Sequence, residues 1–121
     1  MLILTMIFMH IIDDYCLQGI LASMKQKSWW TEQKEYSDLY RYDYIAALFA
    51  HSFSWAFMIM LPVMIKLGFD SSFWCVIAVF ANMIVHAIVD DLKANKKKIN
   101  LITDQMIYLG QILITGLIFL M

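Results

Sequence analysis

Histidine and aspartate residues interrupt two segments that are otherwise apolar enough to cross a membrane. His10 lies four residues before Asp14, and His86 stands at the same spacing from Asp90. Residues four apart project from one face of a helix, so each pair can offer an imidazole and a carboxylate together. Ionisable groups are costly in a bilayer core and usually face one another, a cavity or an ion. The two pairs therefore predict a buried polar centre.

Imidazole and carboxylate together are the donors that a divalent metal accepts in a polar pocket. We therefore predict a bound divalent metal, with zinc as the first choice and manganese or iron as alternatives. A metal-bound water and a spare carboxylate could also support hydrolysis. The predicted metal ligands are His10, Asp14, His51, His86, Asp90 and Asp104, and the candidate catalytic groups among them are Asp14, Asp90 and Asp104.

Other polar residues lie near these positions along the chain. Gln18, Asn82, Lys93, Gln105 and Tyr108 are candidate hydrogen-bond partners of the ligands or contacts for a substrate. Gln18, Gln105 and Tyr108 could equally be ordinary polar contacts between helices.

Asp13 and Asp91 directly adjoin the paired aspartates. Adjacent helical residues point to different faces, so we expect these two side chains to be solvated or to lie as charges at helix ends.

The composition is that of an integral membrane protein. Hydrophobic residues make up 62% of the 121 residues and charged residues only 16%, below the roughly 25% usual in soluble domains. The formal net charge of -1 does not recommend nucleic acid as a partner. We predict an all-α, polytopic four-helix membrane bundle forming one domain over residues 1–121, with spans at about 1–21, 43–66, 71–92 and 100–121 and an interfacial segment at about 22–42.

Basic residues predict the orientation of the bundle. Lysine and arginine concentrate between the first and second spans and between the third and fourth spans. Cytoplasmic loops retain such residues, so we expect loops one and three on the cytoplasmic side of the membrane. Counted from the cytoplasmic ends at 1.5 Å per residue, the three histidines lie roughly 10–16 Å deep. By the same count, Asp14, Asp90 and Asp104 lie about 3–8 Å deep. The donors of four helices should therefore meet at one end of the bundle.

Several short motifs resemble one family in their order along the chain. Residues 10–18 read His-Ile-Ile-Asp-Asp-Tyr-Cys-Leu-Gln and residues 86–93 read His-Ala-Ile-Val-Asp-Asp-Leu-Lys, with His51 between them and Asp104-Gln105 after them. This pattern resembles the bacterial and phage membrane proteins called domain of unknown function 3307. The resemblance implies a small integral protein of the bacterial inner (cytoplasmic) membrane but no activity. Relatives often carry a histidine where this chain has Tyr108, which leaves open the ligands on the last helix and a second metal.

Three functions are compatible with these residues. The first is a metal-dependent hydrolase acting on a lipid-like or amphiphilic substrate that reaches the cytoplasmic interface, where Lys93 or Lys25 could contact an anionic group. The second is a non-catalytic phage or bacterial membrane accessory protein whose polar core is structural or binds a partner. The third, ranked lowest, is an ion or proton conductor, because the outer halves of the helices are almost wholly apolar and conduction needs polar groups throughout. Whether the chain forms an oligomer stays open.

Overall fold

The computed structural model describes residues 1–32, 38–69 and 72–121, and these residues form helices and turns without strands. The all-α prediction is therefore confirmed for the described part of the chain. Long helices are joined by shorter helical turns. In chain order the elements are α1 (Leu2–Ile12), the π-helical η1 (Asp13–Leu17), α2 (Leu21–Met24), α3 (Lys27–Thr31), the 3-10 turn η2 (Asp38–Tyr40), α4 (Asp43–Lys66), α5 (Phe73–Ala94) and α6 (Leu101–Leu120).

Three helices, α4, α5 and α6, are long and apolar enough to cross a membrane. Their mean hydropathies are 1.7, 1.9 and 1.4 over the most apolar windows. The predicted span 43–66 coincides with α4, and the observed α5 and α6 differ from the predicted third and fourth spans by one or two residues at each end. The predicted start of the third span, residue 71, lies outside the described residues.

The helix at the start of the chain is shorter than the span predicted there. Instead of one helix over residues 1–21, α1 has 11 residues and η1 adds 5. The chain then turns at Gly19, where φ is +48°, a conformation that glycine adopts without steric cost. At 1.5 Å per residue the continuous helix is about 24 Å long, compared with a hydrocarbon core of about 30 Å.

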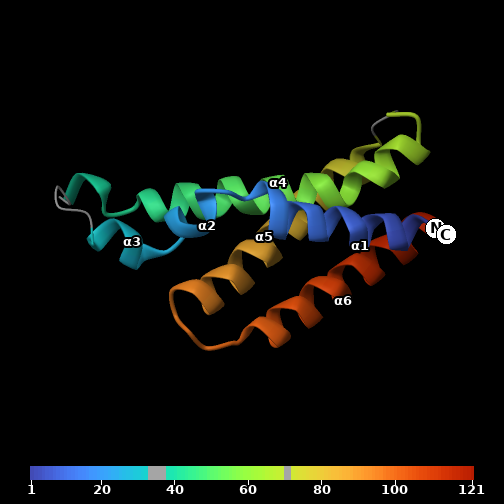
Figure 1. Ribbon diagram of the computed structural model, residues 1–121. Helices are drawn as coiled ribbons and strands as arrows, with labels where there is room; N and C mark the ends of the chain where they lie inside the picture. The colour runs from blue at the N-terminus through green and yellow to red at the C-terminus, as the bar shows by residue number, and fades with distance from the viewer. Residues whose placement is uncertain (33–37, 70–71) are drawn as a thin grey trace.

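The long helices alternate in direction, as Figure 1 shows. Helix α1 packs against α4 and α6, and α5 packs against both α4 and α6. The two termini, the last turn of α4 and the first turn of α5 lie at one end of the bundle. The short helices α2 and α3 and the turn between α5 and α6 lie at the other. Loops one and three therefore share an end, which we call the loop end.

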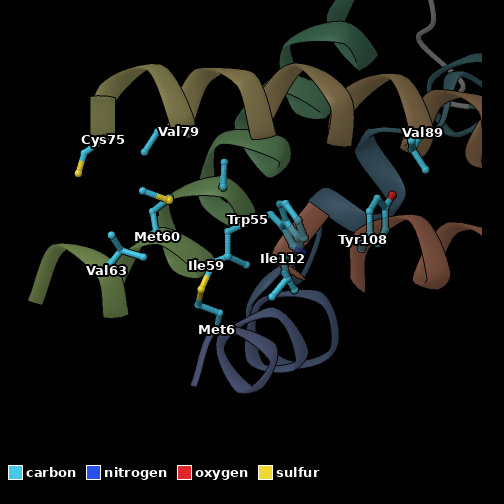
Figure 2. Packing of buried hydrophobic residues seen from close by; sticks show 11 residues of the cluster. Met6, Trp55, Ile59, Met60, Val63, Cys75, Val79, Val89, Tyr108 and Ile112 are labelled. Atoms are coloured by element: carbon cyan, nitrogen blue, oxygen red, sulfur yellow. The ribbon is translucent and has the colours of Figure 1, made fainter. Parts of the chain in front are cut away.

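Buried apolar side chains from the long helices and α1 pack in one cluster inside the bundle (Figure 2). Met6, Ile59, Met60 and Ile112 have no exposed surface, and the burial of such side chains stabilises a fold by roughly 1.5–3 kcal/mol each when the reference is water. Gly116 lets α1 approach α6 closely, because a Cβ there would lie 2.7 Å from a side-chain carbon of Ile3.

Aromatic side chains gather in the segment between η1 and α4. The Trp29 and Trp30 rings meet edge to face with centroids 4.9 Å apart, and Trp30 stacks on Tyr40 at 6.2 Å. The Trp30 indole N–H also donates to the carbonyl of Met24 at 2.8 Å. Part of the predicted interfacial segment, residues 33–37, lies outside the described residues.

Candidate metal centre

Four of the predicted ligands meet at the loop end of the bundle. The two Nε2 atoms of His51 and His86 lie 3.2 Å apart. From His51 Nε2, Asp90 Oδ2 is 3.3 Å away and Asp14 Oδ1 is 3.6 Å away. The helices α4 and α5 and the turn η1 supply these side chains, and all four are at least nine-tenths buried. The predicted convergence of imidazoles and carboxylates from separate helices is therefore present.

The spacing of these atoms suits a metal ion. Asp14, His51 and His86 offer ligand atoms that all lie within 4.8 Å of one another. Four ligands at the usual zinc distances of about 2.0–2.1 Å would be separated from each other by about 3.3–3.4 Å in a tetrahedron. The separations from His51 Nε2 to His86, Asp90 and Asp14 lie close to that value. Asp90 Oδ2 is 3.9 Å from His86 Nε2 and completes a possible fourth position.

The turn η1 presents two adjacent aspartates to the bundle. Its i→i+5 pattern includes a hydrogen bond from the Gln18 N–H to the Asp13 carbonyl at 3.1 Å, and π-turns of this kind are frequent at functional sites. A wider turn rotates successive side chains by less than an α-helix does. Asp13 and Asp14 can therefore both face the neighbouring helices.

The expectation that Asp13 is solvated was wrong. Asp13 is 0% exposed, and its Oδ1 accepts a hydrogen bond from the Ser54 hydroxyl at 2.6 Å. Its Oδ2 lies 3.9 Å from His51 Nδ1, the nitrogen that faces away from the cluster. A carboxylate behind a histidine is the usual arrangement that orients a metal ligand. By contrast Asp91 is partly exposed and lies 3.5 Å from Lys96, as expected for a charge at a helix end.

His10 lies beside the cluster with both ring nitrogens already engaged. The Trp55 indole N–H donates to His10 Nδ1 at 2.7 Å, which leaves the proton on Nε2 for Gln105 Oε1 at 3.0 Å. Asp14 Oδ2 is 3.4 Å from the same Nδ1. His10 therefore serves here as a buried partner of the predicted ligands, although the sequence predicted it as a ligand.

Aromatic rings fix the orientation of His86. Its imidazole stacks on Trp55 and on Tyr108, with ring centroids 4.2 Å apart in both cases. The Tyr108 hydroxyl donates to Asp90 Oδ1 at 3.2 Å. The predicted role of Tyr108 as a partner of a ligand fits this contact, and the aromatic packing holds the imidazole before any ion binds.

Lys25 lies in the site and pairs with one of the predicted ligands. Its ammonium donates to Asp90 Oδ2 at 2.7 Å and to Gln18 Oε1 at 3.1 Å, and the Gln18 amide also donates to the backbone carbonyl of Asp14. Asn95, at the end of α5, donates to the Lys25 carbonyl at 3.1 Å and so attaches this segment to α5. The sequence suggested Lys25 only as a contact for an anionic substrate and did not indicate its ion pair with Asp90.

Asp104 does not join the group of ligand atoms. Its Oδ2 accepts from Lys93 at 2.6 Å, and its Oδ1 is buried without a hydrogen-bond partner among the described atoms. It nevertheless lines a small cavity of about 60 Å³ together with Asp14 and Asp90, which is room for one or two water molecules. Asp104 is therefore placed to contact water near the predicted ligands.

Asn82 belongs to a separate polar network between α5 and α6. Its amide donates to Thr115 Oγ1 at 3.0 Å, and Gln111 donates to Asn82 Oδ1 at 3.1 Å. Such hydrogen bonds hold membrane helices together. Asn82 is thus a helix-pairing residue in this structure.

The aspartates of the site outnumber the lysines that face them. Four aspartates face two lysine ammonium groups, so two negative charges remain when every aspartate is ionised. A divalent ion would balance them, whereas without one the same balance needs two protons. The groups are Asp13, Asp14, Asp90 and Asp104 with Lys25 and Lys93.

Comparison with known proteins identifies no relative: no protein-family model, curated protein or solved structure matches the chain. The similarity to domain of unknown function 3307 therefore stays a prediction from the motifs. The functional argument depends on the arrangement of the side chains.

Proposed function

We propose that the chain is a four-span membrane protein in which α1 with η1 forms a short fourth span. The outward side chains of α1 support this, because Leu4, Phe8 and Ile11 are 62%, 57% and 46% exposed. Apolar residues that surround a helix bundle in this way suit contact with lipid. The lysines of the loop end favour the cytoplasmic side of a bacterial inner membrane, and the clustered rings of Trp29 and Trp30 suit an interfacial segment there.

We further propose that His51, His86, Asp14 and Asp90 bind one divalent metal, with zinc first and manganese or iron as alternatives. The observation that carries the proposal is the set of separations around His51 Nε2, which match the edges of a tetrahedral site. The two unbalanced negative charges of the site support the same conclusion. A single ion fits better than two, because Tyr108 stands where the family pattern often has another histidine and its hydroxyl engages Asp90.

The chemistry proposed for this centre is metal-dependent hydrolysis. A divalent ion makes a bound water more acidic and polarises the bond to be cleaved. Asp104 is then the general base, because it lines the same small cavity and one of its oxygens has no hydrogen-bond partner among the described atoms. It would accept a proton from water as the water oxygen bonds to a carbonyl or phosphoryl centre. The departing alcohol oxygen would then take up that proton.

An amphiphile is the proposed substrate because of where the cavity opens. Gln18 and Lys25 line the cavity, and they belong to the same segment between η1 and α4 that carries Trp29 and Trp30. A molecule with a polar head and an apolar tail would concentrate at that depth. Membership of domain of unknown function 3307 and a bacterial or phage origin belong to the same proposal, and the motif order in the sequence supports them.

Metal analysis of the purified protein in mild detergent tests the metal proposal. We expect about one equivalent of zinc, manganese or iron per chain, and His51→Ala or His86→Ala should each remove it. Asn82→Ala is the matched control, because Asn82 lies one turn from His86 on α5 but bonds to α6. Metal-free wild-type protein after exposure to all three ions would overturn the proposal.

The Asp104→Asn variant separates catalysis from metal binding. We expect it to retain the metal, because Asp104 is outside the ligand group, while the rate of hydrolysis of a chromogenic amphiphilic ester falls by 10²–10⁴-fold, the usual contribution of a general base. An unchanged rate would remove Asp104 from the mechanism. Absence of metal-dependent hydrolysis across acyl and phosphate esters would overturn the enzyme proposal.

A non-catalytic membrane module is the second candidate function. Its supporting observation is that the Lys25–Asp90 and Lys93–Asp104 ion pairs satisfy much of the polar core within the chain itself. A metal-free preparation that is as stable as metal-treated protein would favour this candidate.

A further inference from the structure

A wide polar pocket opens at the loop end, directly outside the candidate metal centre. It has a volume of about 530 Å³, and Lys25, Lys93 and Lys97 line it together with Asp90. Lys25, Lys93 and Asp90 also line the small inner cavity of about 60 Å³ that contains Asp14 and Asp104. The two lysines thus stand at the junction between the open pocket and the candidate metal centre.

The lysines have hydrogen-bond donors that the chain does not use. An ammonium group has three N–H donors. Lys25 uses two of them, on Asp90 and Gln18, and Lys93 uses one, on Asp104. Lys97 is exposed and has no hydrogen bond or ion pair among the described residues. Unused donors from three side chains can therefore point to one bound group.

The charge of the pocket favours an anion once the metal is present. A divalent ion would balance the two uncompensated charges of the aspartates, so the unpaired Lys97 would leave the mouth of the pocket positive. Lysine is an established point-charge partner of phosphate. A phosphate group has several acceptor oxygens and up to two negative charges, so it can engage three ammonium groups at once, which a single carboxylate does less well.

We infer that this pocket binds the phosphate group of the substrate, held by Lys25, Lys93 and Lys97 beside the metal centre. The inference rests on the proposed function and specifies its substrate class as phosphate-bearing. The apolar side chains of Ala22, Ala94 and Ile99 complete the pocket wall, and they leave room for the part of the molecule that carries the phosphate. A phospholipid headgroup and a free phosphate compound share this chemistry.

Isothermal titration calorimetry on metal-treated protein in non-ionic detergent tests the inference. The probes are inorganic phosphate, short-chain phosphatidic acid and short-chain phosphatidylcholine, all below their micellar concentrations. We expect phosphatidic acid to bind at least tenfold more tightly than phosphatidylcholine, whose phosphate is a diester with a balancing positive charge. If phosphatidic acid binds more tightly than inorganic phosphate, the bound phosphate group belongs to a lipid. If these two probes bind with equal affinity, the ligand is a free phosphate compound.

Two neighbouring lysines provide the matched variants. Lys97→Gln should weaken the binding of phosphatidic acid by about tenfold, the effect of losing one hydrogen bond to a charged group. Lys98→Gln should leave it within twofold, because Lys98 does not line the pocket. Lys97→Asn is a second variant, since asparagine tolerates the positive φ of +51° at this position. Equal effects at positions 97 and 98, or equal affinity for the two lipids, would overturn the inference.

Metal content measured on the same samples separates the two proposals. Bound metal without a preference for the phosphate monoester would overturn the phosphate inference and leave the metal proposal standing. Metal-free protein would overturn the proposed function, and because the inference rests on that function, it would fall as well.

Discussion

Replacing Asp13 by asparagine removes one buried charge behind His51 without changing the size of the side chain. Asp13 Oδ1 accepts from Ser54 at 2.6 Å, and Oδ2 faces His51 Nδ1 at 3.9 Å. These two atoms, Oδ2 and Nδ1, are buried. Neither has a hydrogen bond among the described atoms. A slight approach would therefore join them, with the imidazole N–H as donor.

The expected loss can be derived from this geometry. A carboxylate keeps the proton of His51 on Nδ1 and so keeps Nε2 free for a metal. An asparagine amide facing the ring would donate to Nδ1 instead, which moves the proton to Nε2 and blocks the ligand atom. Changes behind metal ligands typically cost 10–100-fold in metal affinity, equivalent to about 1.4–2.7 kcal/mol.

Competition with a chromogenic zinc chelator measures this effect. We expect Asp13→Asn to raise the zinc dissociation constant by 10–100-fold while about one equivalent still binds at saturation. Asp91→Asn is the control, because Asp91 also adjoins a predicted ligand but is partly exposed and pairs with Lys96. Equal affinities of the two variants, with both folded, would refute the orienting role of Asp13.

Three further outcomes test the packing and the metal centre. Gly116→Ala should lower stability by about 1–3 kcal/mol because its Cβ would lie 2.7 Å from Ile3, whereas Gly110→Ala, which meets nothing within 4 Å, should be neutral or stabilising in denaturant unfolding. If both glycine variants behave alike, α1 does not pack on α6 as described. Trp55→Phe keeps a ring against His86 but removes the donor to His10, so we expect about 1–3 kcal/mol of destabilisation; unchanged thermal unfolding would show that this hydrogen bond contributes little. Chelation of the metal should lower the melting temperature, since a ligand that binds only the folded state stabilises it by mass action, and an identical melting temperature after chelation would argue against a bound ion.

The sequence was sufficient to predict the long helices and the meeting of their donors. Continuous apolar runs define α4, α5 and α6 because a membrane span must satisfy its own backbone hydrogen bonds. Alternating helix directions then bring residues of similar depth together, which is why His51 and His86 were expected near Asp14 and Asp90 and lie beside them. Helical spacing and span length carry this information directly.

The sequence could not predict which donors remain available for a metal. His10 has the same i,i+4 relation to Asp14 that His86 has to Asp90, yet Trp55 and Gln105 engage both of its nitrogens. Trp55 is 45 positions and Gln105 is 95 positions from His10 along the chain. Local periodicity does not encode contacts over such separations. Asp104 is also engaged within the chain, because Lys93 near the end of α5 donates a hydrogen bond to its carboxylate.

A helical-wheel argument could not predict that Asp13 faces the inside of the bundle. Such an argument assumes α-helical rotation of about 100° per residue and therefore turns Asp13 away from Asp14. The π-turn over Asp13–Leu17 breaks that assumption at the site itself. Irregular turns of this kind occur disproportionately at functional sites, so the two adjacent aspartates were the place where the periodicity was least reliable.

The apolar packing beyond the polar centre favours a binding site over a conduction path. Toward the end that carries the termini, Met6, Ile59, Met60 and Val63 are fully buried and pack in one cluster, as Figure 2 shows for all four. Conduction needs polar groups or water along the whole path, and these four apolar side chains supply no such group. The described pocket that meets the centre, in contrast, opens at the loop end through Lys25 and Lys93. A ligand would therefore enter and leave by the same opening, which suits a substrate or a retained ion better than a transported one.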